Sequence, residues 1–216
     1  MSGASDTPPP RHLLDRALWA VLAVVLVAVM AAGVLGSRPK TASLPFLGTL
    51  PEFSLVERSG RSVGSKDLRG GIWIADFIFT RCSGICPVLS SAMAKLEKRI
   101  GTDARVRFVS FSVDPAHDTP EVLRSYAQGY QASPRWLFLT GERAELYKLI
   151  QSGFRLAVGD TPEGKASEGE LVTHSDRMVL VDGALRIRGY YHGTDERDLE
   201  ALLRDLKSLE HEDAAR

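Results

Sequence analysis

The chain has 216 residues, and its 27 Lys and Arg residues equal its 27 Asp and Glu residues in number, so its formal net charge is zero. This balance leaves no electrostatic footprint for nucleic acid, and we expect no nucleic-acid partner. Hydrophobic residues make up 44% of the chain, which is ordinary for a globular protein, and the one exception is a segment near the N-terminus.

That segment, residues 17–36, carries no charge and is dense in Val, Ala and Leu. About 20 such residues in a helix span the hydrocarbon core of a bilayer, and Trp19 near one end suits the membrane interface. A cleaved signal peptide is the alternative, but its apolar region is usually only about 7–15 residues long. We therefore predict a single transmembrane anchor after a short head, residues 1–16. Local charge does not decide the orientation, because two basic residues lie on each side: Arg11 and Arg16 before the segment, Arg38 and Lys40 after it.

Three segments follow the predicted anchor. Residues 37–50 contain Pro39 and Pro45 among several small residues and are predicted to be a linker. Residues 51–209 are predicted to form one folded domain, since this length is ample for a single core. Residues 210–216 are predicted to be a tail.

Strand and helix signals alternate along the predicted domain. Asp182-Gly183 between two apolar runs predicts the turn of a hairpin. The predicted strands are residues 72–79, 106–113, 136–139, 177–181 and 185–190, and the predicted helices are 88–100, one opening at 118–121, 144–150 and one starting at 194–196. Helices alternating with strands indicate an α/β sheet, and residues 159–169 are expected to be an exposed insertion.

Cys82 and Cys86, the only cysteines, stand at the turn between the first of these strands and the first of these helices. Residues four apart at a helix start have Cα atoms about 6 Å apart, which allows a disulfide or the binding of one soft metal ion. A helix N-terminus can lower the pKa of either thiol, and Arg81 either adds to this effect or is a solvated surface charge. A structural disulfide and two inert thiols are the alternatives, but so small a loop removes little entropy from the unfolded chain. A functional pair in a thioredoxin-like fold is the favoured interpretation.

His174 is the candidate for a third group at this turn. The cysteines form a C-x-x-x-C pair, one residue wider than the C-x-x-C pair that suits thiol–disulfide exchange. Thioredoxin-like oxidoreductases place a cis-proline just before the strand that faces the dithiol, and this chain has His174 there instead. Two thiolates and an imidazole suit Cu(I) or Cu(II), whereas structural zinc prefers four protein ligands and no fourth is evident. The remaining histidines are interpreted as ordinary residues: His12, His117, His192 and His211.

Three stretches together resemble a known family. Residues 77–87 read Phe-Ile-Phe-Thr-Arg-Cys-x-x-x-Cys-Pro, residues 110–120 read Ser-Phe-Ser-Val-Asp-Pro-x-x-Asp-Thr-Pro, and residues 173–175 read Thr-His-Ser before a strand that ends Val-Asp-Gly. In this order they resemble the Sco/SenC family of membrane-anchored copper-binding proteins, over roughly residues 50–208.

The resemblance implies a thioredoxin-like α/β fold with extra insertions and a Cys82–Cys86–His174 site for one copper ion, Cu(I) or Cu(II), per chain. It implies a copper chaperone for the dinuclear copper centre of cytochrome c oxidase. Its partners would be the copper-bearing oxidase subunit and another copper chaperone as donor. The soluble domain would face the periplasm from the inner membrane, or the intermembrane space in a mitochondrion. Asp114 and Asp118 match the family's Asp-Pro turn, where capping explains them, and Asp176 either orients His174 or points to solvent.

An enzymatic alternative uses the same cysteines. A thiol–disulfide oxidoreductase would attack with Cys82 and resolve with Cys86, keeping the cysteines of the oxidase subunit reduced before copper arrives, and it would not need His174. A peroxidase would need a peroxide-activating environment that nothing beyond Arg81 supplies. A redox or copper sensor would use the same site.

Overall fold

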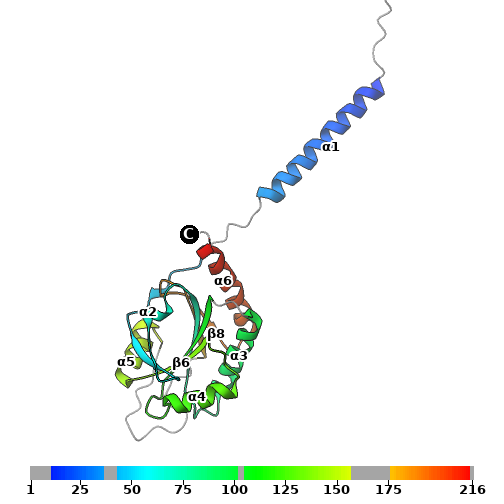
Figure 1. Cartoon of the computed structure of the whole chain (residues 1–216). Coiled ribbons are helices and arrows are strands. Elements are labelled where there is room, and N and C mark those ends of the chain that lie inside the picture. The colour runs from blue at the N-terminus through cyan, green and yellow to red at the C-terminus, as the bar shows by residue number, and fades with distance from the viewer. Residues whose placement is uncertain (1–10, 37–42, 102–104, 157–175, 215–216) are drawn as a thin grey trace, which may run out of the picture. The chain divides into compact units, whose positions relative to one another are not determined.

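The computed structural model of the protein describes residues 11–36, 43–101, 105–156 and 176–214, in two compact units, Met1–Ala42 and Ser43–Arg216. In the first unit, residues Arg11–Gly36 form helix α1, which contains the predicted anchor (Figure 1). Among the described residues, no helix is both long and apolar enough to cross a membrane. The transmembrane anchor over residues 17–36 therefore stays a prediction.

The second unit is built on an eight-stranded mixed sheet with the order β1-β8-β7-β4-β5-β6-β2-β3. Strands β4, β5 and β6 run parallel, and β7 pairs with β4 in the opposite direction. The strands are β1 (Gly48–Thr49), β2 (Ser54–Glu57), β3 (Ser62–Gly64), β4 (Ile72–Ile78), β5 (Val106–Ser112), β6 (Trp136–Thr140), β7 (Arg177–Val181) and β8 (Arg186–His192). The predicted α/β sheet is confirmed, and the sequence analysis missed only β1 to β3, which are too short for a periodic pattern.

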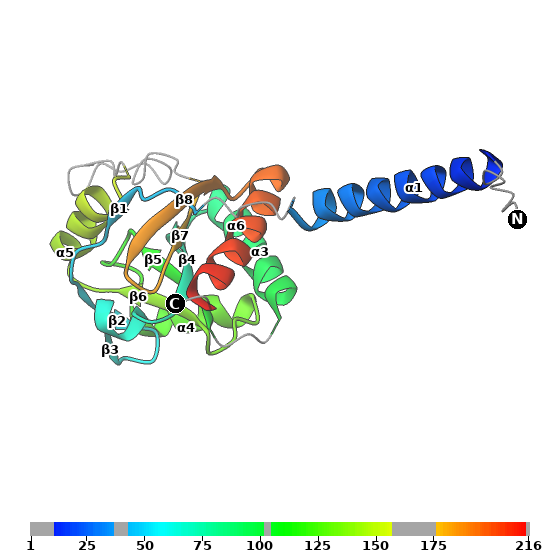
Figure 2. The same cartoon turned by 90° about the horizontal axis from the view of Figure 1, so that it is seen from above.

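Helices cover both faces of this sheet. Figure 2 shows α3 and α6 side by side on one face, with α4 beside them and α5 on the opposite face. The helices are α2 (Ser65–Leu68), α3 (Ile85–Ile100), α4 (Pro120–Gly129), α5 (Arg143–Lys148), which continues as the π-helical turn Leu149–Gly153, and α6 (Glu196–Ala214). The four predicted helices are thus present, and Thr119 caps α4 by accepting a hydrogen bond from the N–H of Val122.

Strand β4 lies at the centre of the domain, and all seven of its residues are buried. Because side chains alternate along a strand, its two faces differ in chemistry. Trp73 and Phe77 point to one face, where they meet Phe111 and Phe154 in an aromatic cluster. The other face carries Ile72, Ile74, Ile78 and a single carboxyl group, that of Asp76.

The hairpin predicted around Asp182-Gly183 forms between β7 and β8. The Asp182 carboxylate accepts hydrogen bonds from the N–H groups of Ala184 and Arg186, each at 3.0 Å. Leu185 has φ of 61° and belongs to the turn, so β8 begins one residue later than predicted. This carboxylate therefore closes the turn, and it also accepts a hydrogen bond from a buried charged side chain further along β8.

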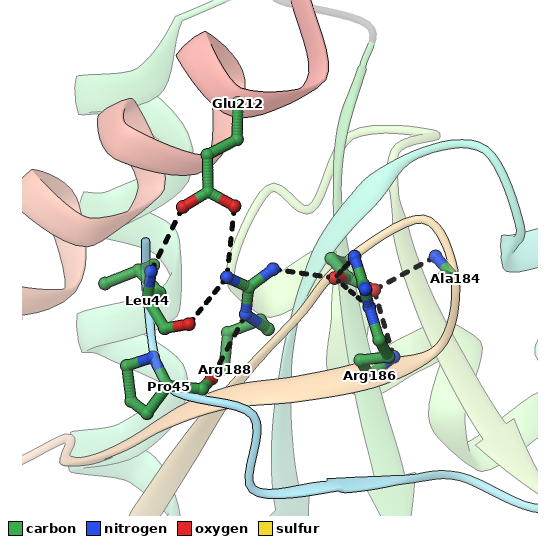
Figure 3. Close-up of polar contacts among 7 residues, drawn as sticks. Leu44, Pro45, Ala184, Arg186, Arg188 and Glu212 are labelled. Atoms are coloured by element: carbon green, nitrogen blue, oxygen red, sulfur yellow. Dashed lines mark hydrogen bonds and ion pairs between the residues drawn. The ribbon is translucent and has the colours of Figure 1, made fainter. Parts of the chain in front are cut away.

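That side chain, Arg188, joins three separate segments (Figure 3). Its buried guanidinium bonds Asp182 at 2.9 Å, Glu212 of α6 at 3.1 Å and the carbonyl of Leu44 at 2.8 Å, and it also bonds the carbonyl of Pro45. Strand β1 then pairs with β8. Part of the predicted linker, residues 37–50, is thus fixed to the domain, which begins at Ser43, and Glu212 of the predicted tail belongs to α6.

Replacing Arg188 by Leu should destabilise the domain by roughly 3 kcal/mol, because Asp182 and Glu212 would lose a buried positive partner. Urea unfolding measured by circular dichroism gives this change. Arg197, whose side chain is almost fully exposed beside Asp195, supplies the matched control: Arg197→Leu should leave the free energy of unfolding nearly unchanged. Equal effects of the two substitutions would contradict the role given to Arg188.

Candidate copper and thiol site

The two cysteines lie where β4 gives way to α3. Cys82 is half-buried in the turn, and Cys86, the second residue of α3, is only 3% exposed. Both are free thiols, and the N–H of Cys86 donates a hydrogen bond to Sγ of Cys82 at 3.4 Å. The capping position of α3 is Gly84, which has no side chain. The sulfur of Cys82 therefore accepts the hydrogen bond that a capping oxygen would otherwise accept. The structure thus brings the two predicted sulfur ligands together within one helical turn.

The thiols differ in acidity. Partial burial acts to raise the pKa of Cys82, but hydrogen bonds from the Cys86 N–H, the Cys86 thiol and other N–H groups at the helix start outweigh it and leave this pKa lowered. Burial raises the pKa of Cys86 strongly, and the nearby Cys82 and Asp76 act in the same direction. Cys82 is therefore the thiol poised to ionise first, as its place at a helix N-terminus predicts.

Asp118 holds the residues just before Cys82. It is fully buried, and its carboxylate accepts hydrogen bonds from the N–H of Thr80 at 3.2 Å and from the hydroxyls of Thr80 and Ser112 at 2.6 Å each. Burial raises the pKa of Asp118, while these hydrogen bonds act to lower it. The sequence analysis explained Asp118 by capping and turn formation. The structure gives it a larger role, because it ties the cysteine turn to the end of β5.

Arg81, the residue before Cys82, is engaged by a second acid of the same loop. Its guanidinium lies 2.6 Å from Oδ2 of Asp114, which is buried. Neither of the two sequence interpretations of Arg81 included this ion pair, and the lowered pKa of Cys82 comes mainly from hydrogen bonds at the helix start. Arg81 and Asp114 thus form a second link between the cysteine turn and the loop after β5.

Asp76 is the functional candidate that the sequence analysis missed. It is fully buried on β4; Oδ1 accepts a 2.5 Å hydrogen bond from Ser110, and Oδ2 has no hydrogen-bond partner among the described residues. Burial raises its pKa to about 7, against which the Ser110 bond acts. Its signal in the sequence is a single acid inside an apolar strand, where an ionised carboxylate would be costly.

His174 lies outside the described residues, as do residues 159–169 of the predicted insertion. Its described neighbour Asp176 precedes β7, which runs antiparallel to β4, so that the start of β7 lies near the end of β4 and the cysteine turn. Asp176 bonds Nδ1 of His192 at 2.8 Å and the hydroxyl of Thr194 at 2.6 Å, which fixes the start of β7 to the turn before α6. No cluster of three His, Cys, Asp or Glu residues suited to a metal is found within the described part of the chain.

Comparison with known proteins identifies the family. The model of the SCO1/SenC family matches residues 46–210. The chain belongs to the SCO1/SenC family. It is 33% identical over 159 residues to the SCO1 protein homolog of Bacillus subtilis, which covers 72% of this chain and 80% of that protein. The family resemblance inferred from the three sequence stretches is therefore confirmed.

Solved structures of Sco proteins share the fold. The structure of BsSco, described as a member of the Sco family of cytochrome c oxidase assembly proteins with a disulfide switch, superposes with a TM-score of 0.67 at 31% identity, covering 77% of this chain and 97% of that one. ScoI of Arabidopsis thaliana with copper bound gives a TM-score of 0.63 at 27% identity, covering 76% and 99%. The α/β fold thus matches the thioredoxin-like structures of Sco proteins.

The two unequal thiols should react at different rates. In the reduced, metal-free chain at neutral pH, iodoacetamide should modify Cys82 about tenfold faster than Cys86, since the thiolate reacts and Cys82 is the more exposed and more acidic thiol. Mass spectrometry of Cys82→Ser and Cys86→Ser variants reads each thiol by itself. Equal rates in the folded chain would contradict the assignment, whereas equal rates in urea are expected.

The buried carboxyl of Asp76 should make the stability of the domain depend on pH. Asp76 keeps its proton to about pH 7 in the folded chain, but in the unfolded chain it ionises near the ordinary value of 3.8. Between these values the unfolded state binds fewer protons, so this residue makes stability fall as pH rises, by about 4 kcal/mol in total. The Asp76→Asn variant should therefore gain stability relative to wild type from pH 4 to 7 and show no further gain above about pH 8.

Urea unfolding of the reduced, metal-free chain at several pH values measures this difference. Ser110→Ala is the matched variant, because it keeps the acid but removes the hydrogen bond that lowers the pKa of Asp76. Its loss of stability with pH should extend to higher pH than that of wild type. A difference between Asp76→Asn and wild type that is independent of pH would rule out a raised pKa at Asp76.

Proposed function

We propose that this protein binds one copper ion through Cys82, Cys86 and His174 and delivers it to the dinuclear copper centre of cytochrome c oxidase. The observation that carries the proposal is the pair of free thiols at the start of α3, one half-exposed and one buried. Its support is the family: a relative of the same fold holds copper, and another belongs to a family of cytochrome c oxidase assembly proteins.

The donor set suits copper in both oxidation states. Thiolates are soft ligands that favour Cu(I), and an imidazole also supports Cu(II). Three ligands leave one side of the ion open, and an open side lets an incoming ligand of another protein replace a departing one. The start of β7 lies beside the end of β4, and this arrangement supports His174 as the third ligand, two residues before Asp176.

The alternative function is a thiol–disulfide oxidoreductase acting on the cysteines of the oxidase subunit. The Cys82 thiolate would attack the partner's disulfide to form a mixed disulfide, and Cys86 would then release the partner as a dithiol while Cys82 and Cys86 become oxidised. The lowered pKa of Cys82 favours this order of attack. Copper binding and disulfide formation compete for the same two sulfurs.

The proposal includes a membrane anchor over residues 17–36 with the copper-binding domain on the periplasmic side of the inner membrane, or in the intermembrane space if the protein is mitochondrial. The run of uncharged residues supports the anchor. Release of the full-length chain from membranes by alkaline carbonate would exclude it.

Copper stoichiometry tests the function. The reduced wild-type chain should bind one copper ion and, with Cu(II), show absorption from thiolate-to-copper charge transfer. Loss of either cysteine to Ala should abolish the site, and His174→Ala should weaken or abolish it, because two ligands hold the ion less firmly than three. Metal analysis, absorption and EPR spectra report these changes.

His211→Ala is the control for a lost imidazole, since His211 lies in the last turn of α6 and is not assigned as a ligand. It should keep one copper ion. Unchanged stoichiometry and spectra in His174→Ala would remove this residue from the site. A wild-type chain that holds no copper but reduces a partner disulfide, with the activity unchanged in His174→Ala, would establish the alternative function.

A further inference from the structure

A groove of about 530 Å³ lies between α3 and the start of α6. Its walls come from two elements that lie side by side in Figure 2. One wall begins at Val88, two residues after Cys86, and the other begins at Gly193, next to His192, which is bonded to Asp176 at the start of β7. Both walls therefore start at the end of the domain that carries Cys82, Cys86 and Asp176. Asp176 follows His174 by two positions.

The floor of the groove is apolar. Ala92 and Leu96 of α3 and Leu199 of α6 line it together with Val88. Val88 is 51% exposed, and in the described part of the Ser43–Arg216 unit only Phe46 is a further exposed large hydrophobic side chain. An exposed apolar side chain at the mouth of a groove, two residues along α3 from Cys86, is a feature of a contact surface rather than of a core.

The rim on α3 is basic. Lys95, Lys98 and Arg99 follow Val88 along the same side of the helix at spacings of seven, ten and eleven residues. Arg99 is paired with Glu200 at 2.7 Å. Lys95 and Lys98 are exposed, and neither has an ion pair with a described carboxylate. Two ammonium groups without an ion-pair partner among the described residues thus stand on this rim, and Glu196 is the acidic residue that lines the facing wall of α6.

We propose that this groove docks an apolar segment flanked by Asp or Glu residues from the protein that receives copper. The proposal rests on the proposed function, and it specifies the surface through which the site reaches its acceptor. The apolar side chain of the segment packs on Val88 and Leu199, and its carboxylates face Lys95 and Lys98. A segment seated in this way brings the acceptor's own ligands to the half-exposed sulfur of Cys82.

The test measures binding without copper, so that docking is separated from metal chemistry. The probe is the metal-free soluble domain of the copper-bearing oxidase subunit from the same cell, titrated into the reduced, metal-free full-length chain and followed by calorimetry. The double charge reversal Lys95→Glu/Lys98→Glu should weaken binding about tenfold at low salt, and the difference from wild type should shrink at high ionic strength. Val88→Ser should also weaken binding, with no change in salt dependence.

The matched control is Arg61→Glu/Lys66→Glu, which makes the same change in charge on the exposed β3–α2 region, away from both groove walls. It should bind the probe as wild type does. Equal weakening by the two double variants, or no weakening by Lys95→Glu/Lys98→Glu, would overturn the proposal, as would failure of the wild-type chain to bind the probe.

Two further measurements keep the outcomes distinct. Copper stoichiometry should be the same in every groove variant as in wild type. A wild-type chain that binds no copper would contradict the proposed function, and this result is separate from the test of the groove. Sedimentation of the chain alone detects a second copy as the occupant. Self-association that Lys95→Glu/Lys98→Glu abolishes would replace the acceptor segment by a dimer contact and overturn the proposal.

Discussion

The hydrogen bonds of the buried Asp118 carboxylate decide where the cysteine turn sits. An ionised carboxylate is costly to bury unless donors surround it, and here the donors are the N–H and hydroxyl of Thr80 and the hydroxyl of Ser112. These bonds connect the end of β4 to the end of β5 at the point where the chain enters α4. The ion pair of Arg81 with Asp114 repeats the connection one residue later. The sulfur of Cys82 is therefore positioned by the sheet rather than by the turn alone.

A turn held in this way can keep its two thiols in different environments. Cys82 receives N–H groups from the start of α3, whereas Cys86 is turned inward above the face of β4 that carries Asp76. The carboxyl of Asp76 acts to raise the pKa of Cys86, and burial raises the pKa of Asp76 itself. Both buried groups thus favour their protonated forms. A metal ion that binds both sulfurs as thiolates must therefore displace the proton of Cys86, which is the more buried of the two thiols.

The sequence predicts the frame of the domain well, because its signals are local. The buried run of β4, the cap of α4 and the turn at Asp182 each follow from neighbouring residues. The short strands β1 to β3 escape prediction because pairing with other strands fixes them. For β1, the distant contacts of Arg188 with the residues just before it add to this. The site divides in the same way. Cys82 and Cys86 follow from spacing at a helix start, but the partners of Asp76 and Asp118 come from other strands and loops, so that no local pattern could assign them.

Helix α3 allows one end of the domain to carry both the reactive thiols and a contact surface. Helix α3 presents the buried Cys86 and Leu89 inward, and Val88 with Lys95 outward, because residues three or four apart share a face of the helix. Gly193 allows the turn before α6 to approach α3 closely, since a Cβ atom there would lie 2.5 Å from a methyl carbon of Leu89. Gly193 thereby forms part of the groove wall. It follows His192 directly, so the wall continues into the Asp176–His192 contact. Helix α3 therefore both positions the thiols and, on its outer face, forms one wall of the groove.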